Sequence, residues 1–433
     1  MLFNPEIETL SREKLRKLQS ERLSKQVAYL YEKVPFYKRK FDEKGLKPGD
    51  IRSIADIHRI PLSFKTDLRD EYPFGFFTAP AGKMARIHCS SGTTGKPVVV
   101  GYSRDDLEIF SEVVARSLAA AGAKPGMMLH NAYGYGLFTG GLGLHSGAEK
   151  LGMTVVPISG GMTDRQLMLL RDFKPEVICC TPSYAQTLAH EARVRGMERF
   201  NLKYAVLGAE PWNEAIRADV EKGLQVSATN IYGLSEIIGP GVSQEDFEEK
   251  GTGSYVWEDH FFPEIIDPKT HEPLEEGKTG VLVFTNLSKS GMAMLRYVTN
   301  DITFLRYDSA GKRTHVKMGP IVGRNDDMLI IRGVNFFPSQ IEELVNGFTE
   351  LAPFFLLTVD FKEHLDTVSI DVEVAREVQL GPAERGNLAE ALSRKVKDTI
   401  GVNVSFHVRD FGSIPRSEGG KISKVKDLRK LKT

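Results

Sequence analysis

Apolar residues near the start of the chain recur at intervals of three to five positions. This spacing gathers their side chains on one face of an α-helix. Because proline removes a hydrogen bond from a helix, the pattern predicts an amphipathic N-terminal helix that ends at Pro35. The apolar positions are Leu15, Leu18, Leu23, Val27, Leu30 and Val34.

The middle of the chain alternates between short β-branched runs and helical patterns. Such alternation is typical of α/β layering around a largely parallel sheet. The predicted helices include Asp164–Phe173 and Ser183–Arg195. The predicted strands include Thr154–Ile158, Val177–Cys180, Tyr204–Leu207 and Val281–Thr285.

The C-terminal part follows a different order. Phe354–Phe361 and Val368–Val374 are predicted strands, Glu384–Ile400 is a predicted helix, and Val402–Val408 is a further strand. This order predicts a compact α+β unit. The polar cluster Gly323–Asp327 marks its beginning, so we expect a large domain over residues 1–323 and a small one over 324–433.

Composition narrows the class of protein. Of 433 residues, 41% are hydrophobic and 26% are charged, which excludes a mostly disordered chain. Lys plus Arg and Asp plus Glu both total 57, so the basic excess of a nucleic-acid or membrane-surface binder is missing. The stretch 416–433 still carries seven basic against two acidic residues, which suits a small phosphorylated substrate.

The cysteine count and the hydropathy pattern indicate where the protein works. Three cysteines, Cys89, Cys179 and Cys180, are too few for a disulfide framework and favour a reducing compartment. We find no apolar leader and no run of about 20 apolar residues, so we expect a cytoplasmic protein.

One polar segment carries the strongest chemical signal. Its two glycines allow a tight turn and close approach to a ligand, and its hydroxyl groups and lysine are suited to phosphate oxygens. Pro97 follows the lysine directly, which excludes a Walker A loop. The segment consists of Ser90, Ser91, Gly92, Thr93, Thr94, Gly95 and Lys96.

This string resembles the phosphate-binding loop of the acyl-adenylate-forming enzymes, a superfamily of acyl-CoA synthetases, luciferases and peptide-synthetase adenylation domains. Further strings match motifs of the superfamily in the expected order, at residues 231–236, 296–301, 323–327 and 416–421. Within the superfamily the chain is most similar to phenylacetate–CoA ligases, on residues 131–143, 239–242, 257–260 and 327–335.

The resemblance implies a fold and a reaction. The fold is a large N-terminal adenylate-forming domain of layered β-sheets and helices, followed by a small mobile α+β domain. The reaction is ATP- and Mg²⁺-dependent: an aryl acid such as phenylacetate is adenylated with release of pyrophosphate, and the thiolate of coenzyme A then displaces AMP. The family also suggests a homodimer, with neither nucleic acid nor membrane as partner.

The resemblance further implies the roles of individual residues. Glu236 would hold Mg²⁺, and Lys421 would be the catalytic lysine. Two glycines stand between Glu418 and Lys421 where the family has one, so Lys424 is a second candidate. Asp326 would be the hinge. Besides the phosphate segment, the ATP and AMP site would comprise Gly208, Ala209, Glu210, Pro211, Tyr232, Gly233, Asp301 and Arg324.

An aromatic and glycine-rich stretch is predicted to meet the acyl group. It shows neither helical nor strand periodicity, and its rings would stack on an aryl substrate. The predicted substrate contacts are Tyr133, Tyr135, Phe138, Gly208, Ala209 and Ile231.

Two other functions fit the same motifs. One is an adenylyl transferase that acts on a phenolic cofactor such as F420, and the other is a non-catalytic nucleotide sensor. Some relatives carry a cysteine-containing zinc site, but residues 241–315 hold no cysteine. We therefore interpret His260, His271 and His315 as structural residues.

Overall fold

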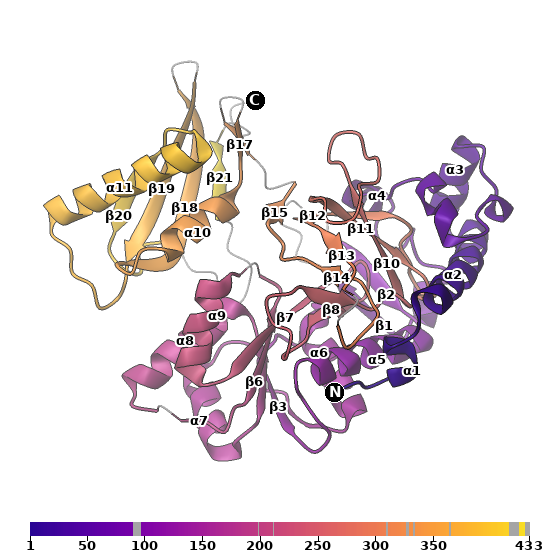
Figure 1. The fold of residues 1–433 in the computed structure, drawn as a ribbon, viewed down its shortest axis with the longest axis horizontal. Coiled ribbons are helices and arrows are strands. Elements are labelled where there is room, and N and C mark those ends of the chain that lie inside the picture. Colours follow the sequence, from indigo (N-terminus) through magenta and orange to yellow (C-terminus); the bar gives the residue numbers. More distant parts are fainter. Residues whose placement is uncertain are drawn as a thin grey trace. The chain divides into compact units, whose positions relative to one another are not determined.

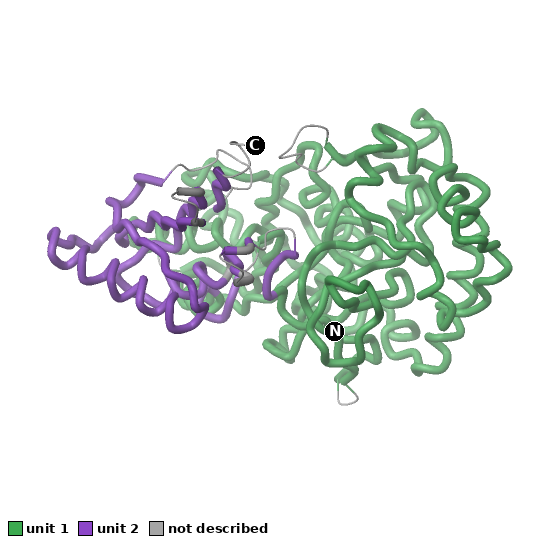
Figure 2. Tube along the Cα trace, turned by 90° about the horizontal axis from the view of Figure 1, so that it is seen from above, with its two compact units in different colours: residues 1–210, 217–321 green, residues 211–216, 322–433 purple. Residues whose placement is uncertain are grey.

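The structure is a computed structural model that describes residues 1–89, 97–197, 199–210, 212–308, 311–325, 329–331, 334–362, 365–414 and 424–428. The chain divides into two compact units. The first comprises residues 1–210 and 217–321, and the second comprises residues 211–216 and 322–433 (Figure 2).

A large sheet forms the centre of the first unit. Within the described residues it has nine strands in the order β13-β14-β9-β8-β7-β6-β5-β3-β4. The neighbours from β4 to β7 run parallel, whereas those from β7 to β13 run antiparallel, so the predicted parallel sheet makes up only one side. The strands are β3 (Met128–Asn131), β4 (Thr154–Val156), β5 (Val177–Cys180), β6 (Tyr204–Gly208), β7 (Ser227–Leu234), β8 (Gly239–Glu245), β9 (Ser254–Val256), β13 (Leu305–Arg306) and β14 (Lys317–Met318).

Helices cover both faces of this sheet. Figure 1 shows α7 (Thr163–Phe173) and α8 (Pro182–Val194) on one side and α5 (Arg104–Ala120) and α6 (Thr139–Leu151) on the other. Glycines let α5 and α6 approach closely, since a Cβ at Gly147 would lie 2.3 Å from the side chain of Val114. The remaining helix along this sheet is α9 (Glu214–Leu224).

The predicted N-terminal helix is confirmed. It is α2 (Arg12–Lys33), and the hydroxyl of Ser11 accepts a hydrogen bond from the backbone N–H of Lys14 at its start. Val34 is extended, as expected of a residue before proline, and α3 (Pro35–Glu43) follows directly. The other short helices of this region are α1 (Pro5–Glu8) and α4 (Lys65–Asp70).

Two further groups of strands complete the first unit. The antiparallel hairpin of β1 (Arg86–Cys89) and β2 (Val99–Tyr102) flanks the predicted phosphate segment in the sequence. The strands β10 (Phe261–Ile266), β11 (Gly280–Asn286) and β12 (Tyr297–Thr303) lie side by side and antiparallel. No helix in the described part of the chain is long and apolar enough to cross a membrane.

The second unit is the α+β arrangement that the sequence predicts. Its main sheet has the order β20-β19-β18-β21, and Leu357, Ile370, Leu392 and Val396 are fully buried in its core. Val402–Val404 precede the last predicted strand rather than belonging to it. The elements are β15 (Gly323–Arg324), β16 (Leu329–Ile331), β17 (Val334–Phe336), α10 (Pro338–Asn346), β18 (Leu351–Lys362), β19 (Leu365–Val374), α11 (Pro382–Ile400), β20 (Ser405–Arg409) and β21 (Val425–Asp427).

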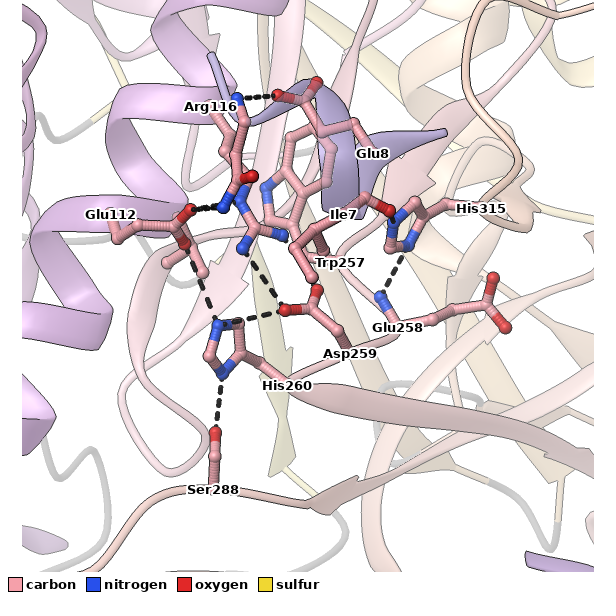
Figure 3. A network of polar contacts seen from close by, with 12 residues as sticks. Ile7, Glu8, Glu112, Arg116, Trp257, Glu258, Asp259, His260, Ser288 and His315 are labelled. Carbon is pink, nitrogen blue, oxygen red and sulfur yellow. Dashed lines mark hydrogen bonds and ion pairs between the residues drawn. The ribbon is translucent and has the colours of Figure 1, made fainter. Parts of the chain in front are cut away.

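A network of buried charges joins the N-terminus to the middle of the first unit. The guanidinium of Arg313 is fully buried and pairs with Glu8 at 2.6 Å and Asp246 at 2.5 Å. Arg116 donates two hydrogen bonds to Asp259, at 2.8 and 3.2 Å (Figure 3). Because removing one partner would leave an uncompensated buried charge, each pair fixes its partner segment in place.

Two histidines of this network are buried as neutral rings. His315 accepts the backbone N–H of Glu258 at Nδ1 (2.9 Å) and donates from Nε2 to the carbonyl of Ile7 (3.3 Å) (Figure 3). Burial lowers the pKa of His315, and burial lowers the pKa of His260 to about 3. His260 lies 3.1 Å from a carboxylate oxygen of Asp259 and 2.6 Å from the hydroxyl of Ser288. Both histidines therefore have polar partners within the first unit.

The lowered pKa values predict that acid destabilises the first unit. Histidine has a pKa of about 6.5 in the unfolded state, and burial lowers it in the folded state. Below pH 6.5 the unfolded state therefore binds more protons than the folded state. Stability is therefore complete above pH 6.5 and falls as the pH drops, by up to about 1.4 kcal/mol per pH unit for each histidine. His315→Gln, which can accept and donate in the same places, should flatten the decline between pH 6 and 5 in urea unfolding. The exposed His58→Gln is the control, and equal slopes in wild type and His315→Gln would contradict the assignment.

Candidate active site

The predicted site segments of the first unit lie where parallel strands end. β3 ends at Asn131, β6 ends at Gly208, and the motif 231–236 occupies the end of β7. The strands β5, β6 and β7 pair in parallel, and β3 pairs in parallel with β5. Their carboxyl ends therefore meet at one edge of the sheet, where α/β proteins bind ligands.

The carbonyl oxygen of Leu137 joins the aromatic stretch to the strand before the phosphate segment. It accepts the backbone N–H of Cys89 at 2.9 Å and the Nδ1–H of His88 at 3.0 Å. Two residues further on, the hydroxyls of Thr139 and Ser235 share a hydrogen bond of 3.2 Å. Three segments that are far apart in the sequence thus come together.

Several predicted site residues lie outside the described residues. They are the phosphate segment from Ser90 to Lys96 (with Ser91, Gly92, Thr93, Thr94 and Gly95), Pro211, Asp326 and Lys421.

Gly208 is placed where only glycine fits. A Cβ there would lie 2.1 Å from the carbonyl oxygen of Ile231 on the neighbouring strand. The hydroxyl of Tyr133 donates to the carbonyl of Gly208 at 3.1 Å, and burial raises the pKa of Tyr133. Ala209 follows in a left-handed conformation (φ 69°) and is exposed, and half-buried Glu210 accepts the backbone N–H of Ser183 at 3.2 Å. This backbone can face a ligand.

The other predicted substrate contacts differ in exposure. Tyr135 accepts the amide N–H of Asn131 at 2.7 Å and lies 3.1 Å from Nδ1 of His145, so its ring is held by two partners. Phe138 is 45% exposed and is free to meet a ligand. Ile231 is only 3% exposed and packs in the hydrophobic core.

Two tyrosines hold the predicted carboxylates. Tyr232 donates to Oδ2 of Asp301 at 2.6 Å, and Tyr297 donates to Oε1 of Glu236 at 3.4 Å. Gly233 allows β7 to meet β8, since a Cβ there would lie 1.8 Å from the carbonyl oxygen of Gly239. Tyr232 and Asp301 are half-buried, which leaves them accessible to a nucleotide.

A single carboxylate fits Mg²⁺ at this place. Glu236 is 7% exposed, and its Oε1 accepts a long hydrogen bond from Tyr297. Mg²⁺ binds oxygen and commonly completes its shell with substrate phosphates and water, so it needs few protein ligands. The described residues contain no group of three or more His, Cys, Asp or Glu side chains that could hold a metal.

The second unit carries two other predicted residues. Arg324 lies in β15. Lys424 is bound to its own unit: its Nζ pairs with Glu342 at 2.7 Å and lies 5.5 Å from the ring centre of Phe355.

Two residues that organise the site belong to motifs matched in the sequence but were given no individual role there. Asn131 binds both Tyr135 and the carbonyl of Gly141, and Tyr297 reaches Glu236. Position at a strand end was the signal for Asn131. Arg296, next to Tyr297, instead pairs with buried Glu264 through two hydrogen bonds of 3.0 Å.

The layered α/β unit, the ligand edge of its sheet and the small α+β unit define the acyl-adenylate-forming class of enzymes. A model of the AMP-binding enzyme family matches residues 8–292, and a model of the AMP-binding enzyme C-terminal domain matches residues 333–429. The chain therefore belongs to the AMP-binding enzyme family, and the resemblance inferred from its motifs is confirmed.

Known proteins resemble the chain over nearly its whole length. It is 59% identical to a phenylacetate-coenzyme A ligase of Thermus thermophilus, over 99% of this chain and 100% of that one. It is 47% identical to a phenylacetate-coenzyme A ligase of Escherichia coli strain K12, over 98% of this chain and 97% of that one. A solved 2-hydroxyisobutyryl-CoA ligase in the postadenylation state, in complex with R3-HIB-AMP, has a TM-score of 0.90 at 27% identity and covers 99% of this chain and 92% of its own.

The bond between Tyr232 and Asp301 predicts a binding effect. Tyr232→Phe removes one hydrogen bond to a carboxylate, which is worth about 1.5–3 kcal/mol, so the affinity for AMP should fall about ten-fold or more in calorimetry. Tyr31→Phe is the matched control, because it removes an exposed hydroxyl that donates to Asp42 at 2.7 Å. Equal AMP affinity in both variants would show that Asp301 is positioned without Tyr232.

Proposed function

We propose that the protein is an AMP-forming phenylacetate–CoA ligase. The observation that carries this proposal is the meeting of the aromatic stretch, the strand before the phosphate segment and the motif 231–236 around Leu137 and Thr139. Relatives that are 47–59% identical over nearly the full chain are phenylacetate-coenzyme A ligases, which supports the choice of acid.

In the first half-reaction a carboxylate oxygen of the acid forms a bond to the α-phosphorus of ATP. The bond from that phosphorus to the bridging oxygen of the β-phosphate breaks, and pyrophosphate leaves with the electron pair. Two anions must approach each other, so oriented donors and cations must offset their repulsion. We assign the phosphates to residues 90–96, the ribose hydroxyls to Asp301 and the purine to the ring of Tyr232. Mg²⁺, held by Glu236, would neutralise phosphate charge when bound.

In the second half-reaction the thiolate of coenzyme A attacks the acyl carbon and AMP leaves. We propose that Lys421 is the catalytic lysine of the first half-reaction. Between the two half-reactions the small domain would rotate about a hinge at Asp326. The ion pair of Lys424 with Glu342 favours Lys421 over Lys424 as the catalytic lysine, because the charge of Lys424 is already paired within its own unit. We also propose a cytoplasmic homodimer.

The ring environment favours an aryl acid over an aliphatic one. Tyr133 and Tyr135 are held by hydrogen bonds through their hydroxyls, which fixes the planes of both rings beside Gly208 and Asn131. A preset aromatic wall binds a flat ring with little loss of entropy.

Purified protein given ATP, Mg²⁺, coenzyme A and phenylacetate should form AMP, pyrophosphate and phenylacetyl-CoA in equal amounts, as measured by chromatography. Acetate should be used at least ten-fold less efficiently, because it cannot fill an aromatic site. Pyrophosphate release that needs no coenzyme A and yields an adenylylated phenol would instead establish an adenylyl transferase. Nucleotide binding without pyrophosphate release from any acid would establish a sensor.

Lys421→Ala should separate the two half-reactions. Adenylation should slow at least a hundred-fold in single-turnover pyrophosphate release, because a cation at the reacting carboxylate is lost. Thioester formation from supplied phenylacetyl-adenylate should stay within about three-fold of wild type. Lys424→Met is the control and should leave adenylation within about three-fold. Loss of adenylation in Lys424→Met alone would reassign the role to Lys424.

A further inference from the structure

Two basic residues and a tyrosine share one face of the β1–β2 hairpin. In the register of the hairpin, Arg86 lies opposite Tyr102, and His88 lies opposite Val100. Side chains of alternate residues in a strand point the same way, so Arg86, His88 and Tyr102 project from one face. The ring of Tyr102 is fully buried.

Three buried nitrogen atoms of residues next to Tyr102 have no hydrogen-bond partner in the part of the chain that the structure describes. They are Nη1 of Arg86, Nε2 of His88 and Nζ of Lys289. The Lys289 ammonium lies 4.5 Å from the ring centre of Tyr102, and the ring of His88 meets the same ring edge-on at 5.6 Å. Lys289 and His88 are each 1% exposed.

This arrangement is expensive for a structural role alone. A buried polar group without a partner costs about 1–3 kcal/mol and a charged group costs more, and a desolvated cation–π contact, which returns about 2 kcal/mol or more, is available to Lys289 but leaves its N–H groups without acceptors. Lys317 is equally buried, yet it pairs with Glu249 at 2.6 Å and Asp308 at 2.9 Å. The fold thus supplies anions to a buried lysine elsewhere in the same unit.

The nearest carboxylates do not serve as partners of Lys289. The carboxylate of Asp106 accepts the backbone N–H groups of Ser103, Ser290 and Gly291 at 2.6–2.9 Å. Burial lowers the pKa of Lys289 to about 8, although the charges of Asp106 and Glu236 oppose this shift. A bound anion would therefore stabilise the charged form of this amine.

The three nitrogens also lie beside the proposed chemistry. The hydroxyl of Tyr102 donates to the carbonyl of Ile238 at 2.8 Å and lies 3.5 Å from the carbonyl of Ser235, on either side of Glu236 in the sequence. β1, which carries Arg86 and His88, ends at Cys89, directly before the phosphate segment. An anion with several oxygen atoms would accept hydrogen bonds from Arg86 and Lys289, and a protonated oxygen of the same anion would donate to Nε2 of His88.

We propose that Arg86, His88 and Lys289 bind the pyrophosphate that leaves during adenylation. This inference rests on the proposed function. As the bond from the α-phosphorus to the bridging oxygen breaks, the electron pair moves to pyrophosphate, and the cations of Lys289 and Arg86 stabilise that charge. His88 donates from Nδ1 to Leu137, so its Nε2 accepts a hydrogen bond from a protonated pyrophosphate oxygen.

Calorimetric titration of the full chain with sodium pyrophosphate, with and without Mg²⁺, tests the site. Lys289→Met and Arg86→Gln should each weaken pyrophosphate binding about ten-fold or more, while the affinity for AMP stays within two-fold. The control Lys83→Met removes an exposed positive charge three residues before Arg86 and should change neither affinity more than two-fold. Because Lys289→Met removes an unpartnered buried cation, its melting temperature should equal or exceed that of wild type.

Pyrophosphate affinities within two-fold of wild type in Arg86→Gln and Lys289→Met would overturn the proposal, as would a wild-type chain that binds no pyrophosphate. Should Lys289→Met fail to fold, Arg86→Gln decides alone, because Arg86 is partly exposed and tolerates replacement. Phenylacetyl-CoA synthesis by a wild type that binds no pyrophosphate would reject this site and keep the proposed function. Pyrophosphate binding that depends on Lys289, in a protein that makes no thioester, would reject the function and keep the site.

Discussion

The carbonyl oxygen of Leu137 is the constraint on which the arrangement of the site depends. It accepts hydrogen bonds from Cys89 and His88, which belong to the strand that leads into residues 90–96. Leu137 itself lies in the stretch that presents Tyr133, Tyr135 and Phe138. Hydrogen bonds to one atom therefore fix the strand before the phosphate segment relative to the aromatic stretch. A shift of either segment would break two hydrogen bonds and leave buried groups unsatisfied.

The first unit treats its buried charges in two ways. Where it joins the N-terminus to the large sheet, every charge drawn in the network has an opposite charge or a hydrogen-bond partner, as with Arg116 and Asp259 (Figure 3). Around Tyr102, buried nitrogens have no hydrogen-bond partner among the described residues. Paired charges specify one fold, whereas unsatisfied groups cost stability and are kept where a ligand repays them. By this contrast, the paired charges stabilise the fold, whereas the nitrogens near Tyr102 are the ones we propose bind a ligand.

The sequence predicted local structure well and assembly less well. The apolar period and Pro35 predicted α2, the pattern of residues 384–400 predicted α11, and the motifs predicted Glu236, Tyr232 and Asp301 as members of one site. The antiparallel side of the sheet was missed, because the pairing of β7 with β8 and β9 depends on register between strands rather than on local pattern. Ile231 was expected to contact substrate, but alternation along β7 turns its side chain into the core. Arg86 and His88 lie on one strand, but Lys289 comes from a distant segment, and no spacing in the sequence indicates that it meets Tyr102.

Near the end of the chain, Lys424 fixes the position of β21 in its sheet. The carbonyl of Lys424 accepts the backbone N–H of Leu357 at 2.9 Å, and its side chain pairs with Glu342, so β21 enters its sheet in a fixed register. Lys421 lies only three residues before this anchor. The extra glycine precedes Lys421 in the sequence, whereas the register of β21 against β18 is set by residues that follow it, so the pairing of β21 does not depend on that glycine.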